Sequence, residues 1–334
     1  MSATETLLLN AATPAAWAGL RLAVLIPCYN EAVAIPKVVA DIAAALPGAD
    51  IYVYDNNSRD GTAAAARAAG AAVRRETLQG KGHVIRRGFA DIDADIYVLL
   101  DGDDTYDAGV APAMVRMLIE EPLDMVTGRR ITELAEAYRR GHRFGNRVLS
   151  GLVRSIFGDR TGDMLSGYRV FSRRFVKSFP ALSAGFEIET EMTVHALELD
   201  MPVGEVPAQY RARPAGSASK LRTYTDGLRI LRTIVQLVKQ ERPLQFFFAS
   251  GFVLLAVGLL LGMPVVFDFL RTGTVPRLPT AVLATGFVLL SFLSFSCGLI
   301  LESVARGRKE MKRLAYLAIP AVLRREGTQV QSFG

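Results

Sequence analysis

Hydrophobic and polar positions along residues 20–240 form short apolar runs that alternate with longer, mixed stretches. The apolar runs predict strands at 22–26, 51–54, 71–74, 96–100 and 124–127. In the stretches between them, apolar residues recur three and four positions apart, which predicts amphipathic helices at 33–46, 62–69, 82–92 and 108–120. Strands and helices that alternate at this spacing predict an α/β domain with a mostly parallel sheet.

The pattern changes in the last third of the chain, where two long stretches are almost free of charge. They span 246–269 and 279–301, and Asp268 is the only charged residue in either. At about 1.5 Å per residue, each is long enough to cross the roughly 30 Å hydrocarbon core of a bilayer. We therefore predict two transmembrane helices joined as an antiparallel hairpin.

Basic residues cluster before the first apolar stretch and after the second, and few lie in the link between them. The clustered residues are Lys239, Arg242, Arg306, Arg308, Lys309, Lys312 and Arg313. By the positive-inside rule, both ends of the hairpin face the cytoplasm. We therefore expect a multi-pass protein of the inner (cytoplasmic) membrane, with its α/β domain and both termini in the cytoplasm.

The chain divides into five predicted segments. An N-terminal tail (1–20), which lacks the basic start of a signal peptide, precedes the α/β domain (21–218). An amphipathic helix (219–243) is expected to lie at the membrane interface. The hairpin (244–303) follows, and then a basic cytoplasmic tail (304–334).

Composition changes this picture only slightly. Half of the 334 residues are apolar, and the excess lies in the hairpin. Cys28 follows the first predicted strand, and Cys297 lies in the middle of the second predicted transmembrane helix, so the two cysteines are not expected to pair. Unpaired cysteines fit a reducing compartment. A net charge of +6 is typical of nucleic-acid-binding proteins, but beside a membrane hairpin it indicates contact with anionic lipid instead.

Polar clusters follow three of the predicted strands. They are P-C-Y-N-E (27–31), D-N-N-S-R-D-G-T (55–62) and D-G-D-D-T-Y-D (101–107). In parallel sheets, ligands bind at the carboxyl ends of the strands. We therefore expect these clusters to meet at one edge of the sheet and to form a site there.

The third cluster carries four carboxylates, Asp101, Asp103, Asp104 and Asp107, and three interpretations of it are open. It is a solvated strand end, with Asp107 capping the next helix. Alternatively, it binds a divalent cation such as Mg²⁺ or Mn²⁺, which prefers carboxylate oxygens. Finally, D-x-D-x-T fits the aspartyl-phosphate motif of haloacid-dehalogenase-type phosphatases, in which Asp101 would attack phosphorus.

Taken together and in order, these motifs and Q-G-K-G (79–82) resemble family-2 glycosyltransferases of the GT-A fold, an α/β, Rossmann-like architecture. Three later stretches and the hairpin resemble the polyprenyl-phosphate branch, which includes dolichyl-phosphate mannose synthases and undecaprenyl-phosphate glucosyltransferases. These stretches are D-M-L-S-G-Y-R-V-F (163–171), F-E-I-E-T-E-M (186–192) and R-P-A-G-S-A-S-K-L (213–221). The resemblance covers residues 23–316. It weakens the phosphatase interpretation, because that motif should follow the first strand of its domain.

The resemblance implies a donor site. Asp103 matches the direct ligand of Mg²⁺ or Mn²⁺, and Asp101 matches a second metal ligand or a ribose contact. Asp55 and Asn56 match the pair that reads the nucleobase. The residues implied to line the base, the ribose and the donor phosphate are Pro27, Tyr29, Glu31 and Lys81. Lys81 also opens a predicted helix, where a cation opposes the macrodipole, and this too indicates an anion beside it.

The resemblance also implies an acceptor site. Asp163 matches a position beside the anomeric carbon, where it acts as a base or positions an arginine or the acceptor. Arg129, Arg213 and Lys220 are expected to hold phosphates, and the segment from Arg213 to Lys220 is expected to form a lid. One of Glu187, Glu189 and Glu191 contacts sugar hydroxyls, or all three form a polar edge of a strand or helix.

The implied activity is inverting transfer of a hexosyl group from a nucleotide-sugar to a polyprenyl phosphate for cell-envelope glycans. UDP-sugars are favoured over GDP-sugars as donors, and undecaprenyl phosphate is the expected acceptor. Membrane lipid is a further partner, nucleic acid is not, and related enzymes suggest a homotetramer. Three alternatives stay open: a family-2 transferase acting on a glycan or protein, a phosphohydrolase, and an inactive membrane assembly partner.

Overall fold

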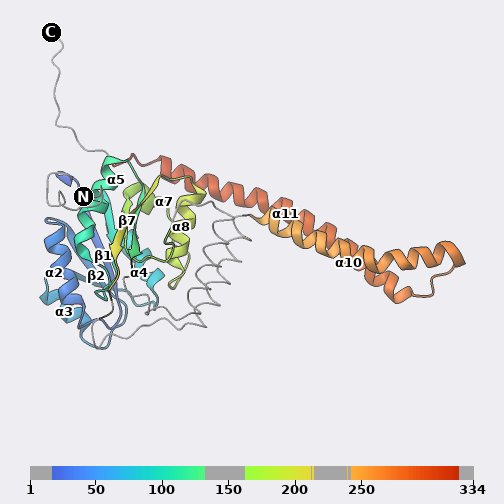
Figure 1. Ribbon diagram of the computed structural model, residues 1–334, viewed down its shortest axis with the longest axis horizontal. Coiled ribbons are helices and arrows are strands. Elements are labelled where there is room, and N and C mark those ends of the chain that lie inside the picture. The colour runs from blue at the N-terminus through green and yellow to red at the C-terminus, as the bar shows by residue number, and fades with distance from the viewer. Residues whose placement is uncertain (1–16, 132–161, 212, 214–238, 240–241, 323–334) are drawn as a thin grey trace, which may run out of the picture. The chain divides into compact units, whose positions relative to one another are not determined.

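The computed structural model describes residues 17–131, 162–211, 213, 239 and 242–322 (Figure 1). The chain divides into two compact units. The first comprises residues 1–227 and 312–334, and the second comprises residues 228–311. The predicted amphipathic helix at 219–243 lies almost entirely outside the described residues.

The first unit contains a seven-stranded sheet in the order β3-β2-β1-β4-β6-β5-β7. β6 is antiparallel to both of its neighbours, and the other pairs are parallel. This confirms the mostly parallel α/β sheet. The strands are β1 (Leu22–Cys28), β2 (Asp50–Asp55), β3 (Ala72–Arg75), β4 (Ile96–Leu99), β5 (Met125–Ile131), β6 (Arg169–Ser172) and β7 (Val203–Gln209).

Helices cover both faces of the sheet (Figure 1). One face packs against α2 (Ile35–Ala45), α3 (Thr62–Ala68) and α5 (Ala111–Glu120), and the other against α4 (Lys81–Asp91), α7 (Arg173–Ser178) and α8 (Ile188–Glu198). A short 3-10 helix, η2 (Ala108–Val110), precedes α5. The amphipathic pattern explains the packing: α2 buries residues spaced three and four apart, namely Ile35, Val38, Val39 and Ile42.

α8 departs from that pattern because all eleven of its residues are buried, several of them charged or polar. Buried charges need partners, and here each has one. Glu189 binds Lys81, Glu191 accepts from the backbone N–H groups of Leu182 and Ser183, and Glu198 binds Lys312. The alternating glutamates therefore lie in a helix and at its N-terminus, and not on a strand edge.

Two predicted boundaries differ from the structure. Trp17 is buried in the core, so the packed unit begins before residue 21. After the hairpin, α11 (Leu278–Leu317) continues past residue 304 as one helix, because strong helix formers replace the apolar run. Within the first unit, Tyr316 donates a 2.8 Å hydrogen bond to the buried carboxylate of Asp124. Residues 304–317 are thus helical and not a tail.

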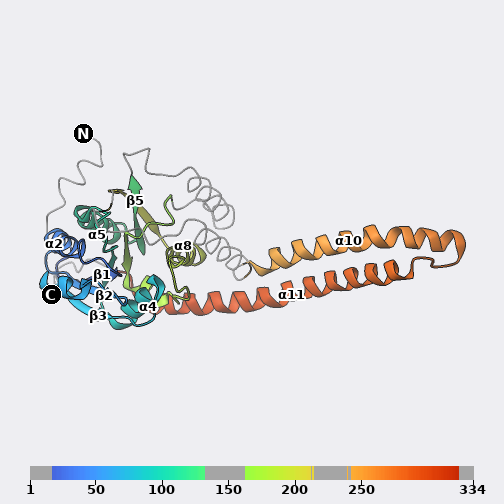
Figure 2. The ribbon, with the colours of Figure 1, turned by 90° about the horizontal axis from the view of Figure 1, so that it is seen from below.

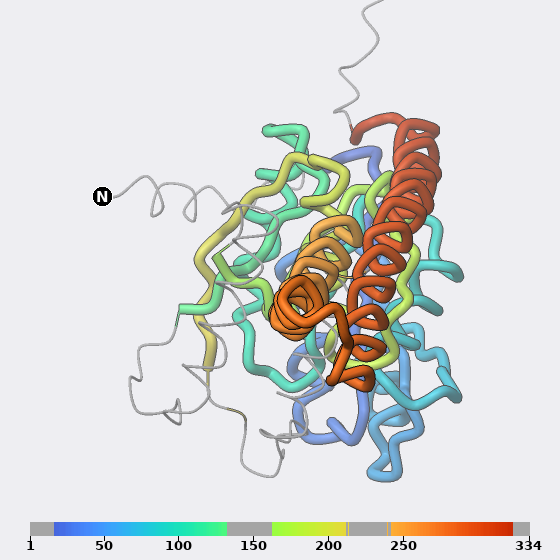
Figure 3. Tube along the Cα trace, turned by 90° about the vertical axis from the view of Figure 1, so that its right-hand side faces the viewer, coloured from blue at the N-terminus to red at the C-terminus, as the bar shows by residue number. Residues whose placement is uncertain are grey.

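The second unit pairs α10 (Pro243–Thr272) with α11 up to Met311, and both helices are long and apolar enough to cross a membrane. They run side by side in opposite directions (Figures 2 and 3). Small residues let them approach closely: Gly251 lies against the Phe295 ring, and Ser294 donates to the Phe247 carbonyl. The buried positions recur every seven residues, at Gly251, Gly258 and Val265 on α10 and at Ala284, Ser291, Gly298 and Ala305 on α11.

Candidate active site

The three polar clusters meet at the carboxyl edge of the sheet, as predicted, because β1, β2 and β4 are parallel neighbours that end there. Glycines show how closely the motifs pack. A Cβ at Gly167, in S-G-Y-R, would lie 2.2 Å from an oxygen of Asp101. A Cβ at Gly82, in Q-G-K-G, would lie 2.0 Å from the Ser183 carbonyl. A larger residue would force the Asp101 side chain or the Ser183 backbone to move, so these glycines let motifs far apart in sequence form one site.

The third cluster, residues 101–107, forms a loop after β4 that we call the acidic loop. Asp103 is its most buried carboxylate. Its Oδ1 accepts hydrogen bonds from the Thr105 backbone N–H at 3.2 Å and hydroxyl at 2.6 Å, and its Oδ2 lies 2.6 Å from Arg213 Nη2. Burial and the negative charge of Asp101 raise the pKa of Asp103 despite these partners. The site therefore favours any cation that approaches this carboxylate.

Asp104 and Asp107, further along the same loop, face different partners. Asp104 Oδ1 lies 2.8 Å from Lys37 Nζ. Asp107 accepts a 3.0 Å hydrogen bond from the Gly109 backbone N–H and caps η2. The capping interpretation of Asp107 is therefore confirmed.

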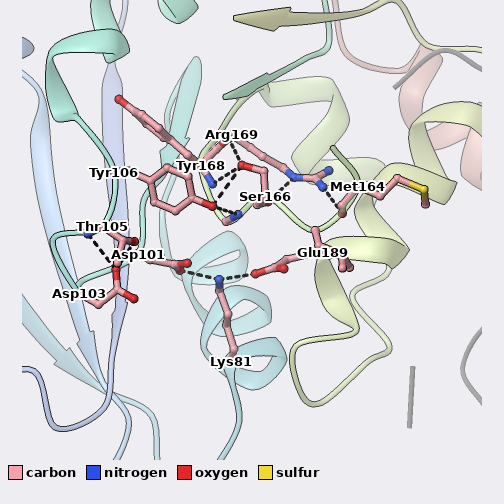
Figure 4. Close-up of polar contacts among 12 residues, drawn as sticks. Lys81, Asp101, Asp103, Thr105, Tyr106, Met164, Ser166, Tyr168, Arg169 and Glu189 are labelled. Atoms are coloured by element: carbon pink, nitrogen blue, oxygen red, sulfur yellow. Dashed lines mark hydrogen bonds and ion pairs between the residues drawn. The ribbon is translucent and has the colours of Figure 1, made fainter. Parts of the chain in front are cut away.

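Lys81 joins two carboxylates at the centre of the site (Figure 4). Its Nζ lies 2.5 Å from Asp101 Oδ1 and 2.6 Å from Glu189 Oε1, and the lysine side chain is 7% exposed. Burial lowers the pKa of Lys81, but the two carboxylates outweigh burial and raise it, so the ammonium group stays charged. The sequence predicted an anion beside Lys81 at the start of α4. Two protein carboxylates, those of Asp101 and Glu189, lie there.

The S-G-Y-R stretch is fixed by a fully buried arginine. Arg169 donates to the carbonyl oxygens of Ser166 at 3.0 Å and Met164 at 2.7 Å, and to the hydroxyl of Thr193 at 2.9 Å (Figure 4). The Tyr106 hydroxyl accepts from the Gly167 backbone N–H at 2.9 Å. These bonds tie the stretch to α8 and to the acidic loop, so Gly167 stays against Asp101.

Asp163 binds Arg130, which the sequence analysis did not single out. Arg130 Nε donates to Asp163 Oδ2 and Arg130 Nη2 donates to Asp163 Oδ1, each at 2.7 Å. Burial raises the pKa of Asp163, but the hydrogen bonds and charge of Arg130 outweigh it, and the net pKa is lowered. Asp163 is therefore ionised near neutral pH and positions an arginine, which is one of the two roles considered for it.

The neighbouring Arg129 side chain points toward Glu205 and not toward Asp163. Arg129 is about half exposed, and its Nε lies 3.8 Å from Glu205 Oε2. Successive side chains on a strand point to opposite faces, which explains why Arg130 and not Arg129 meets Asp163. Lys220 lies outside the described residues, as does the rest of the expected lid beyond Arg213.

The second cluster forms a hydrogen-bonded polar loop after β2, and this loop is one wall of the site. Asp55 is buried, and its Oδ1 accepts from the Ser58 backbone N–H at 3.3 Å. Both amide hydrogens of Asn56 go to backbone carbonyls, those of Glu76 at 3.0 Å and Leu78 at 2.8 Å. Asn56 Oδ1 accepts from the Gly80 backbone N–H at 2.7 Å. Asn56 therefore holds the segment that leads to Lys81.

The residues after β1 lie against this wall. The Asn56 backbone N–H donates to the Cys28 carbonyl at 2.8 Å, and the Glu31 backbone N–H donates to Thr62 Oγ1 at 2.9 Å. Glu31 is buried, whereas Pro27 and Tyr29 are half-buried. The loops after β1 and β2 therefore form one wall beside the acidic loop.

A divalent cation fits this donor set. Among the described residues, no three acidic, histidine or cysteine side chains converge. Mg²⁺ usually takes only one or two carboxylates and fills its other positions with water and substrate phosphates. Asp101 and Asp103 supply two carboxylates of that kind, and each is balanced here by one protein cation, Lys81 or Arg213.

Sequence analysis did not assign two charged residues of the site, Arg130 and Glu189, to it. Arg130 was not considered, and Glu189 was left undecided between two roles. The signal for Glu189 was its place in F-E-I-E-T-E-M, two positions from other glutamates. Nothing in the local sequence separates Arg130 from Arg129, because only the strand register decides between them.

Comparison with known proteins agrees with the fold and the motifs. Residues 23–179 match the description of glycosyl transferase family 2. Glycosyltransferase AglJ of Haloferax volcanii is 33% identical over 297 residues, which are 88% of this chain and 97% of that one. The dolichyl-phosphate hexose transferase of the same organism is 32% identical over 221 residues, 66% of this chain and 95% of that one.

Solved structures give the same fold. The crystal structure of glucosyl-3-phosphoglycerate synthase of M. tuberculosis has a TM-score of 0.54 and 25% identity, and covers 67% of this chain and 82% of that one. A further structure of that protein contains Mn²⁺, UDP-glucose and phosphoglyceric acid, with 23% identity, a TM-score of 0.53, and coverage of 70% of this chain and 82% of that one. The α/β unit is thus GT-A-like, and the phosphohydrolase interpretation falls. The chain belongs to glycosyl transferase family 2 and is a glycosyltransferase.

Proposed function

We propose that the protein transfers a hexosyl group from a nucleotide-sugar to a polyprenyl phosphate held in a membrane. The observation that carries this proposal is that one chain combines the charged site described above with two helices long and apolar enough to cross a bilayer. The relative named dolichyl-phosphate hexose transferase supports a lipid phosphate as acceptor.

The donor occupies the edge of the sheet above β1, β2 and β4. Asp55 accepts from the nucleobase, and Asn56 contributes by holding residues 76–80, since both of its amide hydrogens are already used. Pro27, Tyr29 and Glu31 line the base and the ribose. UDP-sugars are favoured because a structural neighbour was solved with UDP-glucose, and GDP-sugars are the alternative.

Asp101 and Asp103 would hold Mg²⁺ or Mn²⁺. When bound, such a cation neutralises the diphosphate and makes it a better leaving group. Lys81 adds a charged donor at the same place, and Glu189 keeps its ammonium group in position. The positive charge that gathers here offsets the charge that develops as the diphosphate departs.

The acceptor phosphate lies opposite the diphosphate, where Arg213 and Lys220 bind it. One of its oxygens attacks the anomeric carbon in line, the bond from that carbon to the diphosphate breaks, and the configuration inverts. A lipid phosphate is already an anion near neutral pH and needs no general base. Asp163 therefore acts by orienting Arg130.

The remaining parts of the proposal follow from the hairpin and from related enzymes. The protein lies in the inner membrane, with its catalytic unit and both termini in the cytoplasm, where nucleotide-sugars are made. Undecaprenyl phosphate is the expected acceptor, the product serves cell-envelope glycans, and the assembly is a homotetramer.

Metal dependence tests the donor half of this proposal. We expect transfer of labelled sugar into lipid to stop in EDTA and to return with Mn²⁺ or Mg²⁺. Asp103→Asn should lower kcat/KM by about a hundredfold or more, roughly 3 kcal/mol, the scale of losing one strong electrostatic group. Asp107→Asn is the matched control on the same loop, because Asp107 caps η2, and it should retain most activity. Transfer that survives EDTA, or an active Asp103→Asn variant, would contradict the proposal.

A further inference from the structure

Each carboxylate oxygen of Asp103 has a protein partner. Thr105 donates two hydrogen bonds to Oδ1, and the guanidinium of Arg213 lies 2.6 Å from Oδ2. The ion pair is partly buried, since the side chains of Arg213 and Asp103 are 25% and 8% exposed. A cation that binds Asp103 through Oδ2 therefore meets a site that a protein cation already fills.

The segment that leads to Arg213 is fixed against the acidic loop. Tyr210 and Tyr106 form an antiparallel β-bridge, and their rings pack with centroids 5.1 Å apart. The Arg211 backbone N–H donates to the Thr105 carbonyl at 2.8 Å. Two residues beyond this anchor, Arg213 reaches Asp103, so the pair is a product of the strand arrangement.

We propose that Arg213 is an internal competitor of the divalent cation for Asp103, an inference that rests on the proposed function. Arginine stays protonated in proteins, so it cannot yield the carboxylate by losing its charge and has to move away. Thr105 can keep Oδ1 while Oδ2 changes partner. Arg213 thus leaves one anion when the cation arrives and becomes available for another, the phosphate of the acceptor.

This exchange couples the two halves of the reaction. Before the cation and the donor bind, Arg213 is held on Asp103 and is withdrawn from the acceptor phosphate. Afterwards its guanidinium fork can bind a phosphate bidentately. Arg213 therefore favours donor binding before acceptor binding, and it does so at the expense of affinity for the cation.

Binding of Mn²⁺ alone to the full-length protein tests the proposal without any turnover. Unbound Mn²⁺ is measured by electron paramagnetic resonance during a titration. We expect Arg213→Gln to lower the Kd for Mn²⁺ by about three- to tenfold, the effect of removing a partly buried ion pair. Arg211→Gln is the matched control, because it removes the same charge beside the same loop but from Asp107, 3.3 Å away. It should change the Kd by less than about twofold.

A second measurement uses the unmodified protein. Phenylglyoxal modifies accessible arginines, and peptide mass spectrometry gives the extent at each site. We expect Mn²⁺ to increase the modification of Arg213 and to leave that of Arg211 unchanged. Equal or weaker Mn²⁺ binding in Arg213→Gln, an equal gain in Arg211→Gln, or unchanged modification of Arg213 would each overturn the competition alone. If no variant bound Mn²⁺ even with UDP present, the proposed function would fall with it.

Discussion

Arg130 shows how one side chain sets the chemistry of its neighbour. Asp163 is buried, which alone would raise its pKa, yet the two hydrogen bonds from Arg130 lower the pKa below its ordinary value. A carboxylate held this way is charged at neutral pH and becomes protonated only as the pH falls well into the acid range. It holds the guanidinium of Arg130 and, with its lowered pKa, is a weak proton acceptor near pH 7.

Arg130→Gln should reverse that balance. Without Arg130, burial is the larger effect, and the pKa of Asp163 should rise. The acid limb of the pH profile of transfer should therefore move to higher pH. Rates measured from acid to neutral pH with saturating donor give the position of the limb.

Arg129→Gln is the control for this prediction. Arg129 has the same charge on the same strand but faces Glu205, so its loss should leave the acid limb where it is. If both variants moved the limb equally, the shift would reflect net charge, and the pairing of Arg130 with Asp163 would not control it.

At the scale of elements, the start of α4 and the loop before α8 act as one piece. The Gly82 backbone N–H donates to the Ala184 carbonyl at 2.9 Å, and Glu191 holds the backbone N–H groups of Leu182 and Ser183, each at 2.8 Å. The motifs Q-G-K-G and F-E-I-E-T-E-M are about a hundred positions apart. Together they fix the position of Lys81 beside Glu189.

Gly82→Ala should separate these elements. The added Cβ would lie 2.0 Å from the Ser183 carbonyl, so backbone has to move and Lys81 moves with it. We expect transfer to fall by about tenfold or more and the unfolding free energy to drop by about 1–3 kcal/mol, the cost of overpacking. Gly307→Ala, on α11 with open space around it, should be neutral or slightly stabilising. Rates and thermal melts of both variants check this, and a fully active, stable Gly82→Ala protein would contradict it.

The sequence predicts elements best where one local pattern suffices. The first five strands and the four helices between them match within a few residues, because continuous apolar runs and three-four spacing are local signals. β6 and β7 escaped prediction: β6 has only four residues, and β7 carries a glycine and a proline. The start of α8 was left open between strand and helix, because its glutamates show no apolar face and two of its carboxylates, Glu189 and Glu198, pair with residues far along the chain.

The same distinction applies to the site. The carboxylates Asp101 and Asp103 follow a strand end, so sheet topology alone brings them to the site. Their counterions could not be paired from sequence. Lys81, the counterion of Asp101, also meets Glu189 across 108 positions, and Arg213 meets Asp103 three residues beyond the β-bridge of Tyr106 and Tyr210. Spacing identifies which residues carry chemistry, and long-range packing decides which of them touch.

At the scale of the whole molecule, the end of α11 belongs to the α/β unit. Tyr316 donates to Asp124, which Arg174 and Ser172 also bind, and Lys312 lies 2.7 Å from Glu198. A chain cut after Arg242 would lose these contacts and leave part of the buried charge without a partner. Tests of the membrane's role should therefore use the full-length protein.

Membrane topology gives a prediction at this scale. A cysteine introduced at Thr274, in the link between α10 and α11, should react with an impermeant thiol reagent from outside intact cells. A reporter fused after Gly334 should score as cytoplasmic. The excess of basic residues beyond both ends of the hairpin is the physical reason. Labelling from the inside would place the donor site on the side that lacks nucleotide-sugars.

The mass of the product tests the central claim most directly. Full-length protein in liposomes is given a panel of nucleotide-sugars with undecaprenyl or dolichyl phosphate, the matching free polyprenol, or a soluble sugar acceptor. We expect one glycolipid, heavier than the polyprenyl phosphate by a single hexosyl residue and retaining one phosphate. Free polyprenol should stay unmodified, because it offers no phosphate to Arg213. Transfer to the soluble acceptor with every polyprenyl phosphate left untouched would contradict the account, although the membership of glycosyl transferase family 2 would stand.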